Sequence, residues 1–182
     1  MTSEITLIEQ LQNIQTKEQA FRILVTEYKE RLYWHIRKIV ISHDDTDDVL
    51  QNTFIKIYKN IDTFKAQSKL FSWMYRIATN EAITFINKRA KNRNIEVTKM
   101  QEQIVSNLTS DSNFSGDEIQ LILQKAIATL PQKQQLVFNM KYFDEMKYET
   151  ISEILETSIG ALKASYHYAV KKIEEYIRCN TN

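Results

Sequence analysis

The chain has 182 residues, of which only two are glycine and one is proline. Average usage would give about 13 glycines and about 9 prolines. The shortage argues against β-sandwiches, β-barrels and Gly-rich phosphate loops, because these need tight turns and positive backbone φ angles. The formal net charge is +1, yet residues 65–94 hold seven basic side chains and one acidic one, a local excess typical of a nucleic-acid footprint.

Apolar residues recur every three or four positions along the first half of the chain, as in amphipathic helices. This pattern predicts a weak helix over 3–14 and longer helices over 17–41, from about 46 to 62, and over 70–92. Thr46 or a neighbouring aspartate is the expected N-cap of the helix that ends near residue 62. Residues 1–93 therefore form the first expected domain.

Residues 94–117 are polar and rich in Ser and Asn, so we expect a flexible interdomain linker there. Residues 118–182 form the second expected domain, with helices over 117–129, 131–143, 148–155 and 158–178. Pro131 suits the first turn of its helix, and Ser158 is a candidate N-cap. The predicted fold is all-α: two small helical domains joined by a flexible linker.

The last two predicted helices, separated by a three-residue turn, have the form of a helix-turn-helix. Gly160 near the start of the longer helix would leave room for DNA. The side chains that a recognition helix would place in the major groove are Lys163, Ala164, His167 and Lys171. A helical hairpin with a solvated outer face fits the same pattern, so the pattern alone leaves DNA binding open.

Motifs for metal, cofactor or nucleophilic chemistry are missing from the sequence, which has no Gly-rich phosphate loop, no Cys-x-x-Cys and no His-Glu-x-x-His. The acids at 44, 45, 47 and 48 lack the spacing of a calcium loop. We therefore expect no metal, no cofactor and no enzyme activity.

The sequence also bears on location. It shows no signal peptide and no apolar stretch of membrane-spanning length, and Cys179 is the single cysteine. These features predict a cytoplasmic protein without direct membrane insertion.

Three segments, in order, resemble the extracytoplasmic-function (ECF) sigma factors of bacterial RNA polymerase, a group of the sigma-70 family. Residues 47–54, Asp-Asp-Val-Leu-Gln-Asn-Thr-Phe, resemble the family's polymerase-binding helix. Residues 71–80, Phe-Ser-Trp-Met-Tyr-Arg-Ile-Ala-Thr-Asn, resemble its −10-reading and promoter-melting helix. Residues 129–173, with Leu130-Pro131 and the run Ser158-Ile-Gly-Ala-Leu-Lys163, resemble its −35-binding domain.

The resemblance implies a role for each segment. The residues that would contact the β′ clamp helices of core polymerase are Asp47, Asp48, Gln51 and Asn52. The expected −10 contacts are Trp73, Tyr75, Arg76 and Asn80, joined by the basic residues Lys65, Lys69, Lys88 and Arg89. The expected −35 contacts are Ser158, Gly160, Lys163, Ala164, His167 and Lys171.

Simpler interpretations stand beside these roles. The segment from Asp47 is also typical of a capped, solvated helix start, and the basic cluster is typical of a solvated helix end. Phe71 and Trp73 are two residues apart and cannot share a helix face, so at least one of them is expected in the core.

Two charges that the family commonly carries on its recognition helix are missing here. The family's Ser-Arg pair is Ala164-Ser165, and a commonly basic position is Tyr168. We therefore expect DNA affinity to depend more on the basic segment and on polymerase.

The partners implied by the resemblance are core RNA polymerase, through its β′ clamp helices and β subunit, promoter DNA and an anti-sigma factor. Two other interpretations remain: a stand-alone helix-turn-helix regulator with a helical sensor domain, and a helical metal or cofactor enzyme. The segments at 47–54 and 73–80 disfavour the first, since a sensor domain needs neither. The missing ligand motifs disfavour the second.

Overall fold

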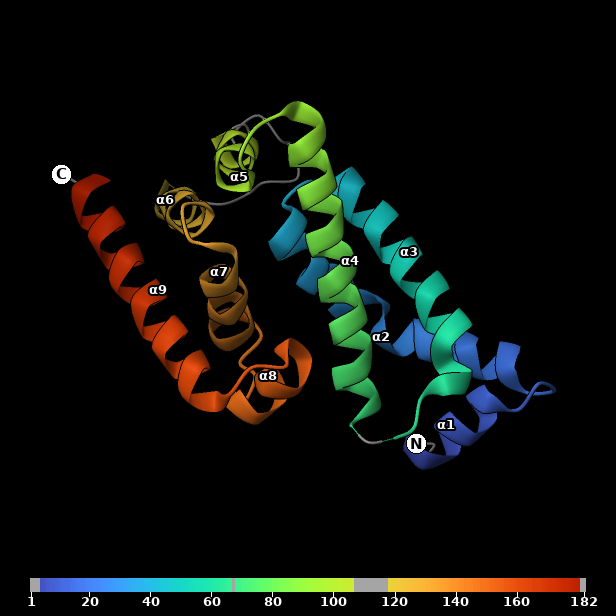
Figure 1. Cartoon of the computed structure of the whole chain (residues 1–182). Coiled ribbons are helices and arrows are strands. Elements are labelled where there is room, and N and C mark those ends of the chain that lie inside the picture. The colour runs from blue at the N-terminus through green and yellow to red at the C-terminus, as the bar shows by residue number, and fades with distance from the viewer. Residues whose placement is uncertain (1–3, 67, 107–117, 181–182) are drawn as a thin grey trace.

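The computed structural model describes residues 4–66, 68–106 and 118–180, and these residues form helices and no strand (Figure 1). The N-terminal helices are α1 (Glu4–Gln12), α2 (Lys17–Val40), α3 (His43–Asn60) and α4 (Leu70–Arg93), with a 3-10 turn, η1 (Ile61–Thr63), after α3. Their bounds agree with the predicted ranges to within a few residues. Helices α2, α3 and α4 pack against one another and form the body of this half.

The N-cap of α3 differs from the prediction. The side chain of Ser42 accepts a hydrogen bond from the backbone N–H of Asp45. Thr46 is buried inside the helix, where its hydroxyl donates to the carbonyl of Ser42 at 2.6 Å. A β-branched residue that satisfies its hydroxyl within the first turn is compatible with the helix interior.

The C-terminal helices are α6 (Glu118–Ala128), α7 (Gln132–Phe138), α8 (Tyr148–Leu155) and α9 (Ile159–Asn180). The expected helix over 131–143 is not uniform, because Asn139–Phe143 form a π-helical turn, η3, after α7. Residues 156–158 join α8 to α9, and the side chain of Ser158 accepts a hydrogen bond from the N–H of Ala161 at 3.4 Å. The predicted helix-turn-helix and its capping serine are therefore present.

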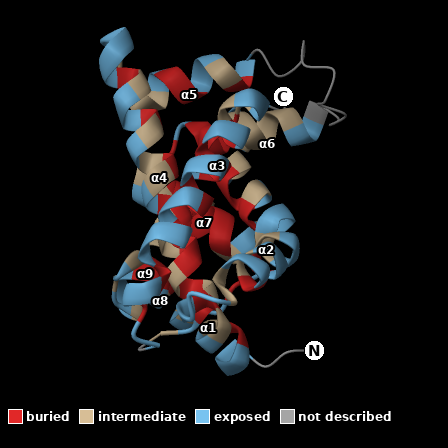
Figure 2. Ribbon diagram, turned by 90° about the vertical axis from the view of Figure 1, so that its right-hand side faces the viewer, coloured by how far each residue is buried: buried red, intermediate tan, exposed pale blue. Residues whose placement is uncertain are grey.

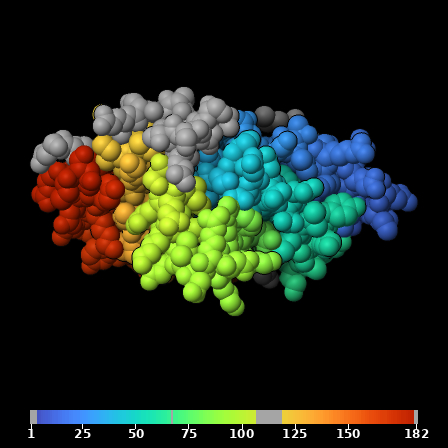
Figure 3. All heavy atoms as spheres, turned by 90° about the horizontal axis from the view of Figure 1, so that it is seen from above, coloured from blue at the N-terminus to red at the C-terminus, as the bar shows by residue number. Residues whose placement is uncertain are grey.

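A helix that the sequence analysis missed lies in the expected linker. Val97–Ser106 form α5, which packs on α4 and α6. Val97, Met100, Ile104 and Val105 have helical spacing, and Met100 and Val105 are fully buried. This short apolar stripe lies among polar residues, so the segment was predicted to be part of the linker and not a helix. Seen from above, α5 and the end of α4 lie between α3 and the C-terminal helices (Figure 3). Residues 107–117 of the expected linker lie outside the described residues.

Buried residues line the facing sides of the helices, whereas the outer sides are exposed (Figure 2). One apolar cluster runs from α1–α5 into the C-terminal half through Leu136, Met140, Met146, Ile151 and Ile154. A second, smaller cluster lies between α6, α7 and α9. The two predicted domains therefore pack directly against each other in this structure.

Candidate nucleic-acid and polymerase interfaces

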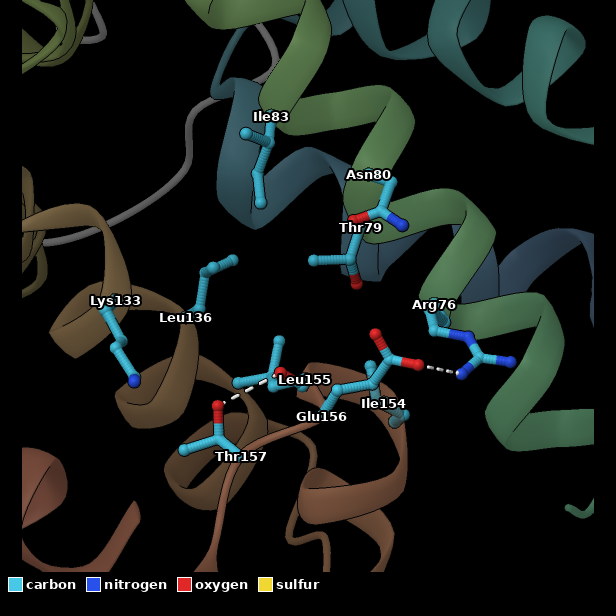
Figure 4. Close-up of a pocket in the computed structure, with 10 residues that line it drawn as sticks. All are labelled: Arg76, Thr79, Asn80, Ile83, Lys133, Leu136, Ile154, Leu155, Glu156 and Thr157. Atoms are coloured by element: carbon cyan, nitrogen blue, oxygen red, sulfur yellow. Dashed lines mark hydrogen bonds and ion pairs between the residues drawn. The ribbon is translucent and has the colours of Figure 1, made fainter. Parts of the chain in front are cut away.

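Two of the expected −10 contacts, Arg76 and Asn80, lie one turn apart on α4 and line a cleft between α4 and the helix-turn-helix (Figure 4). Residues from α7, α8 and the turn after α8 form the opposite wall. The volume of the cleft is about 260 Å³. That is below the ~300 Å³ at which small-molecule pockets begin. Asn80 is exposed, whereas Arg76 is partly buried by its contact with the residue that follows α8.

Polar contacts hold α8 against α4. Arg76 Nη1 donates to Glu156 Oε1 at 2.6 Å, and Ser72 Oγ donates to Glu153 Oε2 at 2.6 Å. The Glu156 side chain is 72% exposed, so its ion pair with Arg76 is worth roughly 0–1 kcal/mol. The contact is weak enough for a DNA phosphate to replace the carboxylate on Arg76.

Tyr75 does not fit the DNA-contacting role expected for it. Its side chain is 3% exposed and packs on Phe71, with ring centroids 4.1 Å apart, and on His35. Burial raises the pKa of its hydroxyl to about 12. The sequence could not separate Tyr75 from Trp73, because both are aromatic and both lie in the basic segment. In this structure Tyr75 is a core residue.

Trp73 lies on a different side of α4 and is half-buried. Its ring packs against that of Phe64, with centroids 5.1 Å apart. Lys65 and Lys69 are exposed between η1 and the start of α4. The structure therefore brings Trp73, Lys65 and Lys69 together at the N-terminal end of α4.

The expected polymerase-binding residues lie along the outer side of α3. Asp48, Gln51 and Asn52 are exposed and line a groove of about 480 Å³ between α3 and α4. Asp47 is also exposed, but its carboxylate turns toward His43, with Nε2 4.0 Å from Oδ2. Ile55, one turn beyond Gln51, is 45% exposed and adds an apolar side chain that the sequence analysis did not single out.

The opposite wall of this groove carries Lys88 and Arg89, which were expected to contact −10 DNA. Arg89 forms an ion pair with Asp45 across the groove. Burial lowers the pKa of Arg89, and the nearby charge of Arg93 adds to this effect. The structure thus groups Lys88 and Arg89 with the α3 residues rather than with Asn80, and the guanidinium of Arg89 already has a partner.

The outward face of α9 carries the expected −35 contacts. Gly160, Ala164, His167 and Lys171 recur at helical spacing and are exposed. Lys163 lies beside them, with its ammonium 5.8 Å from the ring centre of Tyr148 on α8. A Cβ on Gly160 would meet no atom within 4 Å, so protein packing does not require glycine there. Tyr168, 57% exposed, extends the face beside His167.

A third interdomain contact joins α2 to the residue after η3. Lys38 forms an ion pair with Asp144, and His35 Nδ1 lies 3.6 Å from Asp144 Oδ2. Burial pushes the pKa of Asp144 upward, but the interactions with His35 and Lys38 outweigh it and hold the pKa below its usual value. His35 Nε2 also lies 2.8 Å from Thr79 Oγ1 on α4. One buried histidine therefore links α2, α4 and the C-terminal half.

Sequence reasoning missed Asp144, Glu153 and Glu156. Their partners lie about a hundred or eighty positions away in the chain. Such pairs leave no periodic signal, and nothing local marks these acids as different from other surface acids.

The described residues also bear on metal binding and on membrane spanning. No three His, Cys, Asp or Glu side chains in that part of the chain gather to hold a metal ion. Nor does any helix there have the length and apolar character needed to cross a membrane.

Comparisons with known proteins match both halves of the chain. The sigma-70 region 2 family model matches residues 24–92, and the sigma-70 region 4 model matches residues 120–173. The ECF RNA polymerase sigma factor SigW of Bacillus subtilis is 30% identical, over 96% of this chain and 98% of its own. The ECF RNA polymerase sigma-E factor of Haemophilus influenzae is 27% identical, over 94% of each chain.

Two solved structures share the fold. CnrH in complex with the cytosolic domain of CnrY superposes with a TM-score of 0.70 at 19% identity, covering 99% of each chain. The sigma factor RpoE in complex with the anti-sigma factor NepR, from Bartonella quintana, has a TM-score of 0.65 at 19% identity, covering 88% of this chain and 98% of its own.

Proposed function

This chain belongs to the ECF sigma factors of the sigma-70 family, and on that premise we propose that it binds core RNA polymerase, directs it to specific promoters and promotes melting of the −10 element. RNA synthesis itself is the work of the polymerase. The protein acts in the bacterial cytoplasm, where sigma factors meet core polymerase. Its further partner is an anti-sigma factor, as in the RpoE–NepR structure.

Helix α3 is the proposed contact with the β′ clamp helices. Asp48, Gln51 and Asn52 offer donors and acceptors on an exposed helix face, which suits a specific and hydrated protein interface. Asp47 lies at the edge of this face.

Helix α4 and the residues before it are the proposed −10 reader. The amide of Asn80 can both donate to and accept from a base edge, and Arg76 one turn away can contact a phosphate. Trp73 offers a ring for an unstacked base, and Lys65 and Lys69 supply charge beside it. Tyr75 is left out of this set because it is buried.

Helix α9 is the proposed −35 reader. It would enter the major groove with Gly160, Ala164, His167 and Lys171 toward the bases and Lys163 toward a phosphate. Ser158 contributes mainly by capping the helix.

The mechanism follows from holding two DNA-binding helices, each of low affinity alone, on one polymerase. Once one helix has bound its promoter element, the other is held at a high effective concentration near its own element, which raises the overall affinity. Binding of a strand phosphate at Arg76 would displace Glu156, so a core polymerase that favours separation of α8 from α4 would also favour binding of the −10 strand. Melting is then driven by differential affinity for the unpaired strand.

The observation that carries this proposal is the presence, on one chain, of an exposed polar face on α3, an exposed Asn80 beside Arg76 on α4, and a helix-turn-helix whose second helix, α9, has an exposed outer face. Run-off transcription with purified core polymerase and a promoter library tests it. We expect specific initiation only when this protein is added. No stimulation, together with tight binding of duplex DNA by the protein alone, would instead identify a stand-alone helix-turn-helix regulator.

Replacing Asn80 by alanine sharpens this test. Asn80→Ala should change the −10 sequence preference while core binding stays within about twofold of wild type, since a lost base contact is worth about 1–3 kcal/mol of discrimination. Asn87→Ala removes an exposed amide from the same helix beyond the cleft and is the matched control. Loss of core binding by Asn80→Ala would assign the residue a structural role.

A further inference from the structure

Helix α1 precedes the residues matched by the sigma-70 region 2 model, yet it contacts the segment that leads into the proposed −10 reader. In Figure 1 the chain between α3 and α4 runs past α1 at the lower end of the bundle. Leu7 and Leu11 are buried in the large core cluster, so α1 is anchored to the N-terminal half.

One end of this segment is held by Gln12. Its side-chain Nε2 donates to the carbonyl of Ile61 at 3.1 Å and to the carbonyl of Phe64 at 2.9 Å. The carbonyl of Ile61 also accepts a hydrogen bond from the backbone N–H of Phe64, so Gln12 is a second donor to it. One side-chain amide thus contacts both the start of η1 and the residue that follows it, and it ties the chain leaving η1 to α1.

The other end is held by Glu4. The backbone N–H of Leu70, the first residue of α4, donates to Glu4 Oε1 at 2.8 Å. The N-cap residue Lys69 makes no side-chain cap hydrogen bond. The cap of α4 is therefore supplied by a carboxylate 66 positions earlier in the chain, where its negative charge also suits the positive end of the helix dipole.

The residues between these two attachments carry the charges of the −10 reader. Lys65 and Lys69 are exposed, and Phe64 packs on the ring of Trp73. Ala66 has a φ of 52°, a left-handed conformation that non-glycine residues seldom adopt. Such a backbone persists where its surroundings determine it, and α1 contacts the chain before Ala66, at Phe64, and after it, at Leu70.

We propose that Glu4 and Gln12 are positioning residues for −10 recognition. They hold the segment between η1 and α4 so that Lys65, Lys69 and Trp73 form one preorganised surface for the unpaired strand. Preorganisation raises affinity because the ordering cost is met before binding. This inference rests on the proposed sigma function and extends it to a helix that itself contacts no DNA.

The test measures binding of a single-stranded −10 oligonucleotide by the holoenzyme. Glu4→Ala and Gln12→Ala should each weaken this binding about tenfold, while binding of core polymerase and of −35 duplex stays within about twofold. Glu9→Ala and Gln15→Ala change exposed residues on α1 and just after it, and they should behave as wild type. Glu4→Gln keeps an oxygen acceptor for Leu70 N–H and should restore most of the affinity lost in Glu4→Ala.

Unchanged binding of the −10 strand by Glu4→Ala and Gln12→Ala would overturn the inference. A parallel loss of core, −35 and −10 binding would overturn it too, since that pattern marks a general loss of folding. If Glu4→Ala unfolds, Gln12→Ala decides, because it should still weaken −10 strand binding about tenfold, and unchanged binding by this variant would overturn the inference. Failure of the wild-type holoenzyme to bind the strand at all would instead count against the proposed function.

Discussion

At the scale of single residues, the type of a side chain did not predict whether it is exposed and free to contact DNA. Trp73 and Tyr75 are both aromatic residues of one basic segment, but Tyr75 faces the core whereas Trp73 lies at the end of α4 near Lys65 and Lys69. Arg76 and Arg89 are both expected phosphate ligands, yet each already pairs with a carboxylate. Their use in DNA binding requires exchange of one anion for another.

Gly160 gives a sharp prediction at this scale. A methyl group would meet no protein atom, so Gly160→Ala should leave the free energy of unfolding unchanged or raise it by up to about 1 kcal/mol through helix propensity. The same methyl would lie between α9 and DNA. We expect −35 duplex binding to weaken about tenfold, equivalent to ~1.4 kcal/mol.

Chemical denaturation and a duplex-binding titration measure these two effects separately. Wild-type affinity in a stabilised Gly160→Ala variant would show that DNA does not approach α9 at this position.

At the scale of elements, apolar periodicity predicted most helices but not all. The long stripes of α2, α3 and α4 gave bounds within a few residues of those observed. Helix α5 escaped because its stripe is short and lies among polar residues, and the π-helical turn η3 has no periodic signature. The pairing of α8 with α4 could not be predicted, since it depends on single side chains far apart in sequence.

The stability contributed by the ion pair between Lys38 on α2 and Asp144, the residue after η3, should depend on pH. Because the folded-state pKa of Asp144 lies below its usual value, which is about 3.9 in an unfolded chain, its ion pair stabilises the fold above about pH 4. That contribution is lost as the pH falls through the folded-state pKa. At pH 7, Asp144→Asn should lower the free energy of unfolding by about 1–3 kcal/mol.

Urea unfolding at several pH values measures this effect, and the difference between wild type and Asp144→Asn should shrink at acidic pH. Asp62→Asn is the matched control, because Asp62 pairs with Lys17 but is 55% exposed, so its loss should cost less than about 1 kcal/mol. If both variants lost the same free energy of unfolding, the ion pair of Asp144 would contribute no more to stability than an exposed surface pair.

At the scale of the whole molecule, the structure combines an open face on α9, the proposed −35 reader, with a proposed −10 reader that is covered only in part. The outer side of α9 is exposed, whereas Arg76 and Asn80 face α8 across a narrow cleft. The side chain of Arg76 is therefore less accessible in this arrangement than the proposed contacts on α9.

Removing the acids that hold α8 on α4 should favour the separated arrangement. The double variant Glu153→Ala and Glu156→Ala eliminates both polar contacts. Residue 156 has a φ of 50° in the wild type, and alanine keeps a non-glycine residue at this position. The exposed ion pair contributes roughly 0–1 kcal/mol and the Ser72 hydrogen bond about 0.5–1 kcal/mol, which together predict a gain in −10 strand affinity of roughly two- to thirtyfold.

A fluorescence-anisotropy titration of the free protein measures this gain. The double variant Glu145→Ala and Glu149→Ala also removes two exposed acids, one on α8 and one shortly before it, and so controls for the change in net charge. A gain of the same size in this control would attribute the effect to charge alone.

The central claim is that two readers on one chain direct one polymerase to a two-part promoter. Mapping of transcript 5′ ends, made by core polymerase with this protein from a library that varies both elements and the spacer between them, tests it most directly. We predict transcripts that require the protein, share two sequence elements and decline when the spacer changes by a few base pairs. Transcripts that are independent of the protein, or insensitive to the spacer, would contradict the account.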